Sequence, residues 1–231
     1  MFATLGHVVM KSFMLIWLYT SPNSWRGMPT PGPGSSVRVD GPQTRRILLC
    51  GSGIVVGYGV ASHELALGGA LARSLAARCG QGFEVETLTA PRLTTGEVSR
   101  QLTSEHTAER AAVVLSFGVF EALTFMPPKT WARNMETLVD TLLDRTPPDA
   151  QIFIVNCVPP KMSSFPVRYQ QAIEAASVTY NSQIKSLASR HERVHYLRYS
   201  PVREEPDAID GRQSYRVWAD GLAPDIAAAL C

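Results

Sequence analysis

The chain has 231 residues, 45% of them hydrophobic, which is enough to bury one substantial core in a single globular domain. Charges nearly balance, with 22 Lys plus Arg against 20 Asp plus Glu, and no run of five like charges occurs. This distribution argues against a nucleic-acid partner. The cysteines form no CxxC pair, so neither a zinc site nor a dithiol redox site is expected, and no cofactor or metal is predicted.

The first 20 residues are largely apolar, but Lys11 interrupts them. The longest uninterrupted stretch, residues 12–19, is too short to span a bilayer. Two interpretations stay open for residues 1–20. They form a weak membrane anchor or uncleaved signal segment, which implies membrane association or export, or they are a simple extension of a cytoplasmic protein.

Residues 21–44 contain five prolines and four glycines and little apolar material that could pack. The sequence therefore predicts a linker over 21–44 and a globular domain over 45–231.

Within the domain, short apolar runs rich in strand formers alternate with segments whose apolar residues recur at helical spacing. The predicted strands span residues 45–52, 83–90, 111–119, 151–158 and 195–199. The predicted helices span residues 64–79, 94–106, 130–144, 169–191 and 215–230.

Local signals support several of these boundaries. Ser62 is the expected N-cap of the first helix, and Thr94 with Glu97 is the expected capping box of the second. Cys50 and Cys157 lie in apolar runs and are predicted to be buried free thiols. The alternation of strands and helices predicts an α/β fold, a three-layer α/β/α sandwich around a five-stranded parallel sheet. Sites in such sheets lie beyond the carboxyl ends of the strands.

The segment after the first strand reads GSGIVVGYGV, from Gly51 to Val60. It resembles the first block of the SGNH (GDSL-type) hydrolases, G-D-S-[LI]-x-x-G-x-G, at Gly51, Ile54, Gly57 and Gly59. The resemblance covers about residues 45–230. It implies a flavodoxin-like fold and, for the family, hydrolysis of carboxylic esters.

Aligned without a gap, the signature positions of this family are mostly substituted. Ser52 stands at the position of the signature Asp, and Gly53 stands at the position of the nucleophile. The remaining substitutions are Arg92 for the oxyanion glycine, Phe120 for the oxyanion Asn and Gln213 for the catalytic His, whereas Asp210 is retained.

These substitutions predict a pseudoenzyme that binds a ligand or acts as a scaffold. A serine needs a base that accepts its proton, and the oxyanion needs donors, so the loss of both removes family-type turnover. The pairing of Arg92 with Phe120 suggests an acyl ligand with an anionic head. That hypothesis requires Arg92 to face the interior.

Three alternatives remain. A shift of one residue makes Ser52 the nucleophile of an active esterase or acyltransferase with a rewired site. Glu121 and Asp210 could form an acid-based pair. The glycines after the first strand also resemble a dinucleotide fingerprint, although no acid follows the second strand. The histidines nearest the predicted helix and strand ends are interpreted as surface or helix-end residues: His63, His106, His191 and His195.

Overall fold

A computed structural model describes residues 11–17, 19–21, 27–32, 36–159, 166–198 and 211–231. Its described residues form a six-stranded sheet in the order β1-β3-β2-β4-β5-β6. The strands are β1 (Ser36–Val39), β2 (Arg45–Gly51), β3 (Phe83–Thr89), β4 (Ala112–Ser116), β5 (Gln151–Val155) and β6 (Val194–Leu197). All neighbouring pairs are parallel except β1 with β3.

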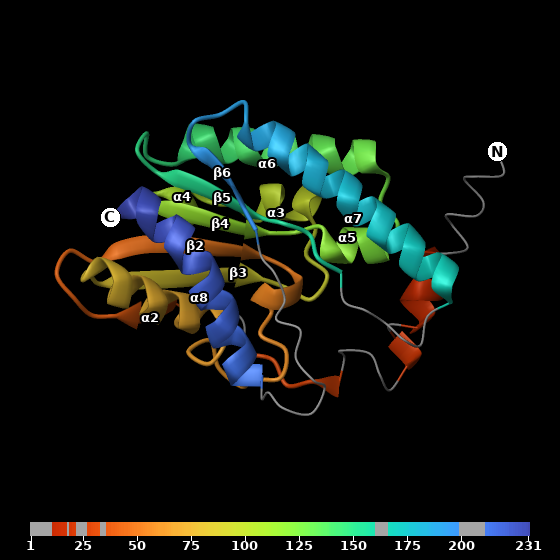
Figure 1. Cartoon of the computed structure of the whole chain (residues 1–231), viewed down its shortest axis with the longest axis horizontal. Helices are drawn as coiled ribbons and strands as arrows, with labels where there is room; N and C mark the ends of the chain where they lie inside the picture. Colours follow the sequence, from red (N-terminus) through yellow and green to blue (C-terminus); the bar gives the residue numbers. More distant parts are fainter. Residues whose placement is uncertain (1–10, 18, 22–26, 33–35, 160–165, 199–210) are drawn as a thin grey trace.

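The helices cover both faces of this sheet, with α2 and α8 on one side and α3, α6 and α7 on the other (Figure 1). Their bounds are α2 (Leu67–Cys79), α3 (Thr95–Gln101), α4 (Ser104–Thr107), α5 (Val119–Leu123), α6 (Pro128–Arg145), α7 (Val167–Ala188) and α8 (Gly211–Leu230), with a 3-10 turn η2 (Gly53–Val55). The predicted three-layer α/β/α sandwich is therefore confirmed. All five predicted strands are present, each within a few residues of its predicted bounds.

The strand β1 corrects the predicted linker and the predicted strand count. Residues 36–39 pair antiparallel with β3 from Ser36 opposite Glu86 to Val39 opposite Phe83. In this strand Val37 is buried, whereas Ser36 and Arg38 are exposed, as expected of a short edge strand with one core-facing side. Four residues among prolines and glycines are too few for a periodicity signal, so the sequence did not reveal the strand.

Two helix boundaries also test the sequence. The helix α2 begins at Leu67 and not at Ser62, whose carbonyl instead accepts the N–H groups of Leu65 and Ala66 in a preceding turn. The capping box of α3 is confirmed, because the Glu97 carboxylate accepts the Thr94 N–H at 3.0 Å.

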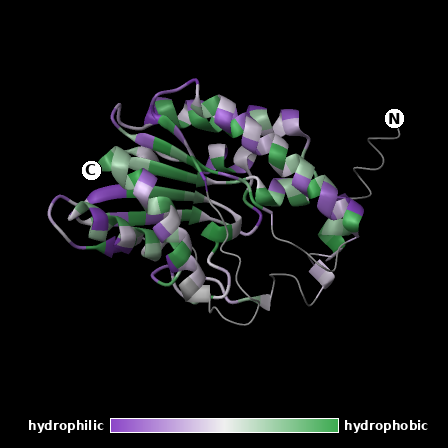
Figure 2. Cartoon of the chain, viewed as in Figure 1, coloured by the Kyte–Doolittle hydropathy of each residue, from purple (hydrophilic) through white to green (hydrophobic). Residues whose placement is uncertain are grey.

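The apolar core is divided between the two faces of the sheet, and the strands are the most continuous hydrophobic part of the chain (Figure 2). On the α6–α7 face, Trp131 stacks on Tyr180 with ring centroids 4.5 Å apart. On the other face, a disulfide joins Cys79 at the end of α2 to Cys231 after α8, with a Cα–Cα distance of 5.7 Å. This bond was not predicted from the sequence.

The amino-terminal segment packs on the domain. Residues 11–17 and 19–20 are helical, Met14 is fully buried, and the ring of Phe13 lies 5.3 Å from that of Tyr169 at the start of α7. None of the helices in the described ranges is long and apolar enough to cross a membrane.

Candidate functional site

The carboxyl edge of the sheet is held together by the turn that follows β2. The Ser52 N–H donates to the Ser116 carbonyl at 3.0 Å, and the Thr89 hydroxyl donates to the Gly51 carbonyl at 2.7 Å. A Cβ added to Gly51 would lie 2.1 Å from the Ser116 oxygen. The turn is thus fixed between β3 and β4, and residue 51 must be glycine for the strands to approach this closely.

The two candidate nucleophile positions lie side by side in this turn but differ in their surroundings. Ser52 is 2% exposed, and its Oγ has no hydrogen-bond partner among the described residues. Gly53 is partly exposed, with φ of +63°, and the nearest heavy atom to an added Cβ is Val119 Cβ at 3.9 Å. The position with room for a side chain has none, and the residue with a hydroxyl is enclosed.

Part of the predicted linker lines the outer side of the turn. The Pro29 carbonyl accepts the Gly59 N–H at 2.9 Å, and Pro31 lies 2.8 Å from where a Cβ of Gly57 would be. The Gly32 carbonyl lies 3.0 Å from His63 Nε2. The prediction that His63 is a surface or helix-end residue is wrong, because only 4% of it is exposed. The turn between Ser62 and α2 directs the ring inward.

Glu121 connects the β3–α3 loop to the β4–α5 turn. It is fully buried, and its carboxylate accepts the Thr95 N–H at 3.0 Å and the Gly118 N–H at 2.9 Å. Burial raises the pKa of Glu121, and this effect outweighs the hydrogen bonds to the carboxylate, which lower the pKa. The carboxylate therefore fastens the β3–α3 loop to the β4–α5 turn, a positioning role that leaves neither oxygen without a partner.

Phe120 and Arg92 stand at the two oxyanion positions of the resemblance. Phe120 is half-buried in α5 and has no polar side-chain atom. Arg92 is exposed, donates to the Tyr19 hydroxyl and lies 5.4 Å above the centre of the Tyr19 ring. The hypothesis of an anionic ligand head required an inward-facing Arg92, and this contact with the amino-terminal helix does not support it.

The last block of the resemblance is described only in part. Asp210 lies outside the described residues, so its pairing with Glu121 stays a prediction. Gln213 is in the first turn of α8, with its side chain outside the described set. Hence the acid-based alternative receives no geometric support.

Two other histidines, His106 and His195, have partners away from the β2 turn. His106 Nδ1 lies 2.8 Å from the Thr103 hydroxyl, and His195 Nε2 lies 2.8 Å from the Gln151 amide oxygen. Desolvation lowers the pKa of His195. Within the described ranges no histidine reaches the Ser52 hydroxyl, and no group of three His, Cys, Asp or Glu residues could hold a metal ion.

Asn181 is a polar anchor of the carboxyl edge that was not predicted from the sequence. The side-chain amide of Asn181 in α7 accepts the Cys157 N–H at 2.7 Å and donates to the Cys157 carbonyl at 2.9 Å, fixing the chain just after β5. Its only sequence signal is a polar residue beside the apolar stripe of a helix. Cys157 and Cys50 are buried free thiols, as predicted.

Comparisons with known proteins give one family match. The model of the GDSL-like lipase/acylhydrolase family matches residues 49–226. Among curated proteins, no sequence matches the chain.

Solved structures with a similar fold include esterases. A family two carbohydrate esterase from Clostridium thermocellum aligns with a TM-score of 0.61 and 12% identity, over 81% of this chain and 64% of that one. The corresponding enzyme from Cellvibrio japonicus gives 0.60 and 15%, over 83% and 63%. The psychrotrophic esterase EstA from Pseudoalteromonas sp. gives 0.59 and 17%, over 79% and 96%. The chain thus spans less than two thirds of both carbohydrate esterases, and identities this low show the shared fold alone.

Proposed function

The chain belongs to the GDSL-like lipase/acylhydrolase family, and we propose that it binds a small ester or acyl ligand at the carboxyl edge of its sheet without hydrolysing it. One observation carries the proposal. The only serine in the β2 turn is 2% exposed and without a partner for its Oγ, whereas the neighbouring position with room for a nucleophile is Gly53.

The chemistry of acyl transfer explains why this arrangement supports a silent site. A serine hydroxyl attacks a carbonyl only when a positioned base accepts its proton, and Ser52 Oγ has no such neighbour in the described structure. Donors must also stabilise the oxyanion, and Phe120 supplies none where the family has an amide. Loss of nucleophile and base together removes the machinery as a unit.

The class of ligand is supported by the surroundings of Gly53. This position is partly exposed and has Val119 Cβ as its nearest neighbour, and α5 adds the half-buried ring of Phe120 nearby in the chain. Apolar walls beside a backbone turn suit the acyl part of a small molecule. Small ligands are also bound by relatives, since the Clostridium thermocellum esterase was solved with cellohexaose and EstA with monoethylphosphonate.

The decisive experiment measures hydrolysis of short-chain p-nitrophenyl esters by the full chain, with fluorophosphonate labelling and mass spectrometry in parallel. We expect rates at the buffer blank and no adduct. The full chain is required because β1 and residues 29–32 are part of the folded domain. Binding is measured separately, as a rise in melting temperature with butyrate or octanoate that Phe120→Ser reduces.

The same experiment tests the active-esterase alternative. Turnover that disappears in Ser52→Ala, with an adduct on Ser52, would show that this residue is the nucleophile and that the proposal is wrong. Neither turnover nor a thermal shift would instead favour a scaffold role.

A dinucleotide site is the least supported alternative. In dinucleotide-binding folds the helix opens at the glycine turn, whereas α2 begins only at Leu67, well after Gly53. Titration with NADPH, with no change in its fluorescence, would close this possibility.

A further inference from the structure

The amino-terminal helix has an exposed apolar side as well as a buried one. Met14 is fully buried and Trp17 packs against the α6–α7 core, whereas Phe13 is 43% exposed, Ile16 61% and Tyr19 48%. The three exposed residues recur every third position, which places them along one side of a helix. Both sides of this helix are therefore apolar: one packs on the domain and the other is exposed.

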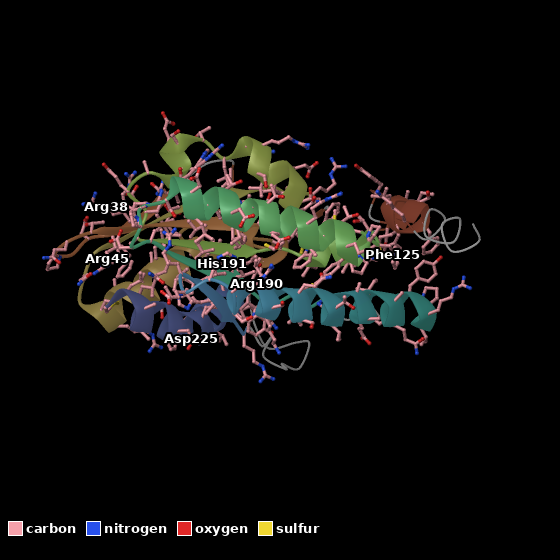
Figure 3. The ribbon with its side chains drawn as sticks, turned by 90° about the horizontal axis from the view of Figure 1, so that it is seen from above. Arg38, Arg45, Phe125, Arg190, His191 and Asp225 are labelled. Carbon is pink, nitrogen blue, oxygen red and sulfur yellow. A yellow bond between two sulfur atoms is a disulfide. The ribbon has the colours of Figure 1, made fainter. Side chains whose placement is uncertain are left out.

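This exposed side lies at the start of α7. The ring of Phe13 contacts that of Tyr169, which is in the first turn of α7. Figure 1 shows the amino-terminal helix beside the first turn of α7, and Figure 3 shows it at the same end of the molecule as Phe125. We call these three residues, Phe13, Ile16 and Tyr19, the amino-terminal patch.

The patch gathers exposed apolar residues on one short helix. Seven large hydrophobic residues are exposed in the described ranges, and three of them belong to the patch. Single exposed apolar residues are ordinary, whereas a contiguous group marks a surface that contacts something apolar.

Positive charges surround the patch. Lys11 is exposed on the same helix, Arg92 contacts Tyr19, and Arg168 lies 5.3 Å above the ring of Tyr169. The sequence has no Asp or Glu before Asp40. On α7 the first acid is Glu174, two turns from the helix start, and it accepts a hydrogen bond from Gln170.

We propose that the amino-terminal patch docks this protein peripherally on a bilayer that contains anionic lipid. Apolar side chains with a basic rim are the signature of elements that lie in the plane of the interface and do not cross it. Anionic headgroups complement Lys11, Arg92 and Arg168, whereas a second copy of the patch would bring like charges together.

This inference does not depend on the loss of hydrolysis. It gives the site an orientation, because Arg92 follows β3 at the carboxyl edge and belongs to the same surface. Docking through the patch would turn that edge toward the bilayer, where acyl-bearing molecules are concentrated.

The test is co-sedimentation of the full chain with vesicles of phosphatidylcholine, alone or mixed with phosphatidylglycerol. We expect binding to the mixed vesicles that weakens as salt is raised. Equal binding to both vesicle types, or none to either, would overturn the proposal. So would salt-resistant self-association in solution that Ile16→Ser abolishes, since it would assign the patch to a second copy.

Paired variants test whether vesicle binding depends on the patch or on any exposed apolar residue. Ile16→Ser combined with Tyr19→Ser should weaken vesicle binding by about tenfold or more, because each apolar side chain that enters the interface adds to the binding. The control is Val178→Ser on α7, where Val178 is 70% exposed and lies outside the patch. Equal losses in the two proteins would contradict the proposal.

A second pair of variants tests whether vesicle binding requires the positive charges around the patch. Lys11→Glu should weaken binding to the mixed vesicles by roughly tenfold, since each basic residue near an anionic surface contributes about 1 kcal/mol and reversal also adds repulsion. Arg38→Glu is the control, because Arg38 lies at the opposite end of the molecule from Phe125 (Figure 3). Circular dichroism verifies that each variant is folded.

Discussion

Two turns at the carboxyl edge of the sheet differ in how closely they are packed. The turn after β4 is tightly packed, and the turn after β2 has free space. In the β4–α5 turn, Gly118 has φ of +106°, an added Cβ would lie 3.0 Å from Cys157 Cβ, and its N–H is bound by Glu121. In the β2 turn, position 53 has room for a side chain, and the Ser52 hydroxyl has no partner within the described structure.

The difference shows that the features that hold the edge in shape are separate from the side chains that could react. Backbone conformation, glycine contacts and a buried carboxylate hold the edge in shape, and none of them requires a reactive side chain. The positions that would perform acyl transfer can therefore change while the frame persists.

The largest expected effect is that of Gly118→Ala. A positive φ disfavours a side chain by about 1–2 kcal/mol, and contact with Cys157 adds overpacking of about 1–3 kcal/mol. We expect the free energy of unfolding, from urea denaturation, to fall by about 2–5 kcal/mol. Gly53→Ala is the control and should lose only about 1–2 kcal/mol. Equal losses would show that the two turns are alike.

Glu121→Gln should come next. Its amide can accept only one of the two N–H groups that the carboxylate accepts now, so a buried donor from Thr95 or Gly118 is left without an acceptor. The expected loss is about 1–3 kcal/mol in the same urea measurement. The half-buried Glu136 is the control: Glu136→Gln breaks only its ion pair with Arg190 and should change stability by less than about 1 kcal/mol.

The stability difference between wild type and Glu121→Gln should depend on pH. Because burial raises the pKa of Glu121, the folded state binds this proton more tightly than the unfolded state. The contribution of Glu121 to stability is then complete below its ordinary pKa of 4.5 and declines as pH rises through the raised value. The gap between wild type and Glu121→Gln should be wider near pH 4 than near pH 7. A gap that widens toward neutral pH would show that the backbone donors dominate.

The smallest effect is expected for Ser52→Ala. Removal of a buried hydroxyl without a partner relieves an uncompensated polar group, so stability should change by less than about 0.5 kcal/mol or rise slightly. A loss above about 1 kcal/mol would mean that Ser52 has a hydrogen-bond partner and that the β2 turn is as fully satisfied as its neighbour.

Much of the fold was predictable because strands and helices of ordinary length leave periodic signals. Residues 36–39 left none, and the amino-terminal helix was obscured because both of its sides are apolar. The alignment of residues 53, 92 and 120 with the family's signature positions stays a prediction. The surroundings of these residues could not be predicted, since the contact of Arg92 with Tyr19 joins residues 73 positions apart.

The disulfide gives the chain a topology of its own. By joining Cys79 to Cys231 it closes a covalent ring that contains β3 to β6, and it leaves β1 and β2 on a linear tail. The tail strand β2 nevertheless lies in the middle of the sheet, between the ring strands β3 and β4. The strand that leads into Ser52 and Gly53 is thus inserted between strands of a closed ring. Hydrogen bonds and packing hold β2 in place, whereas the ring strands β3 to β6 are also linked by a covalent bond.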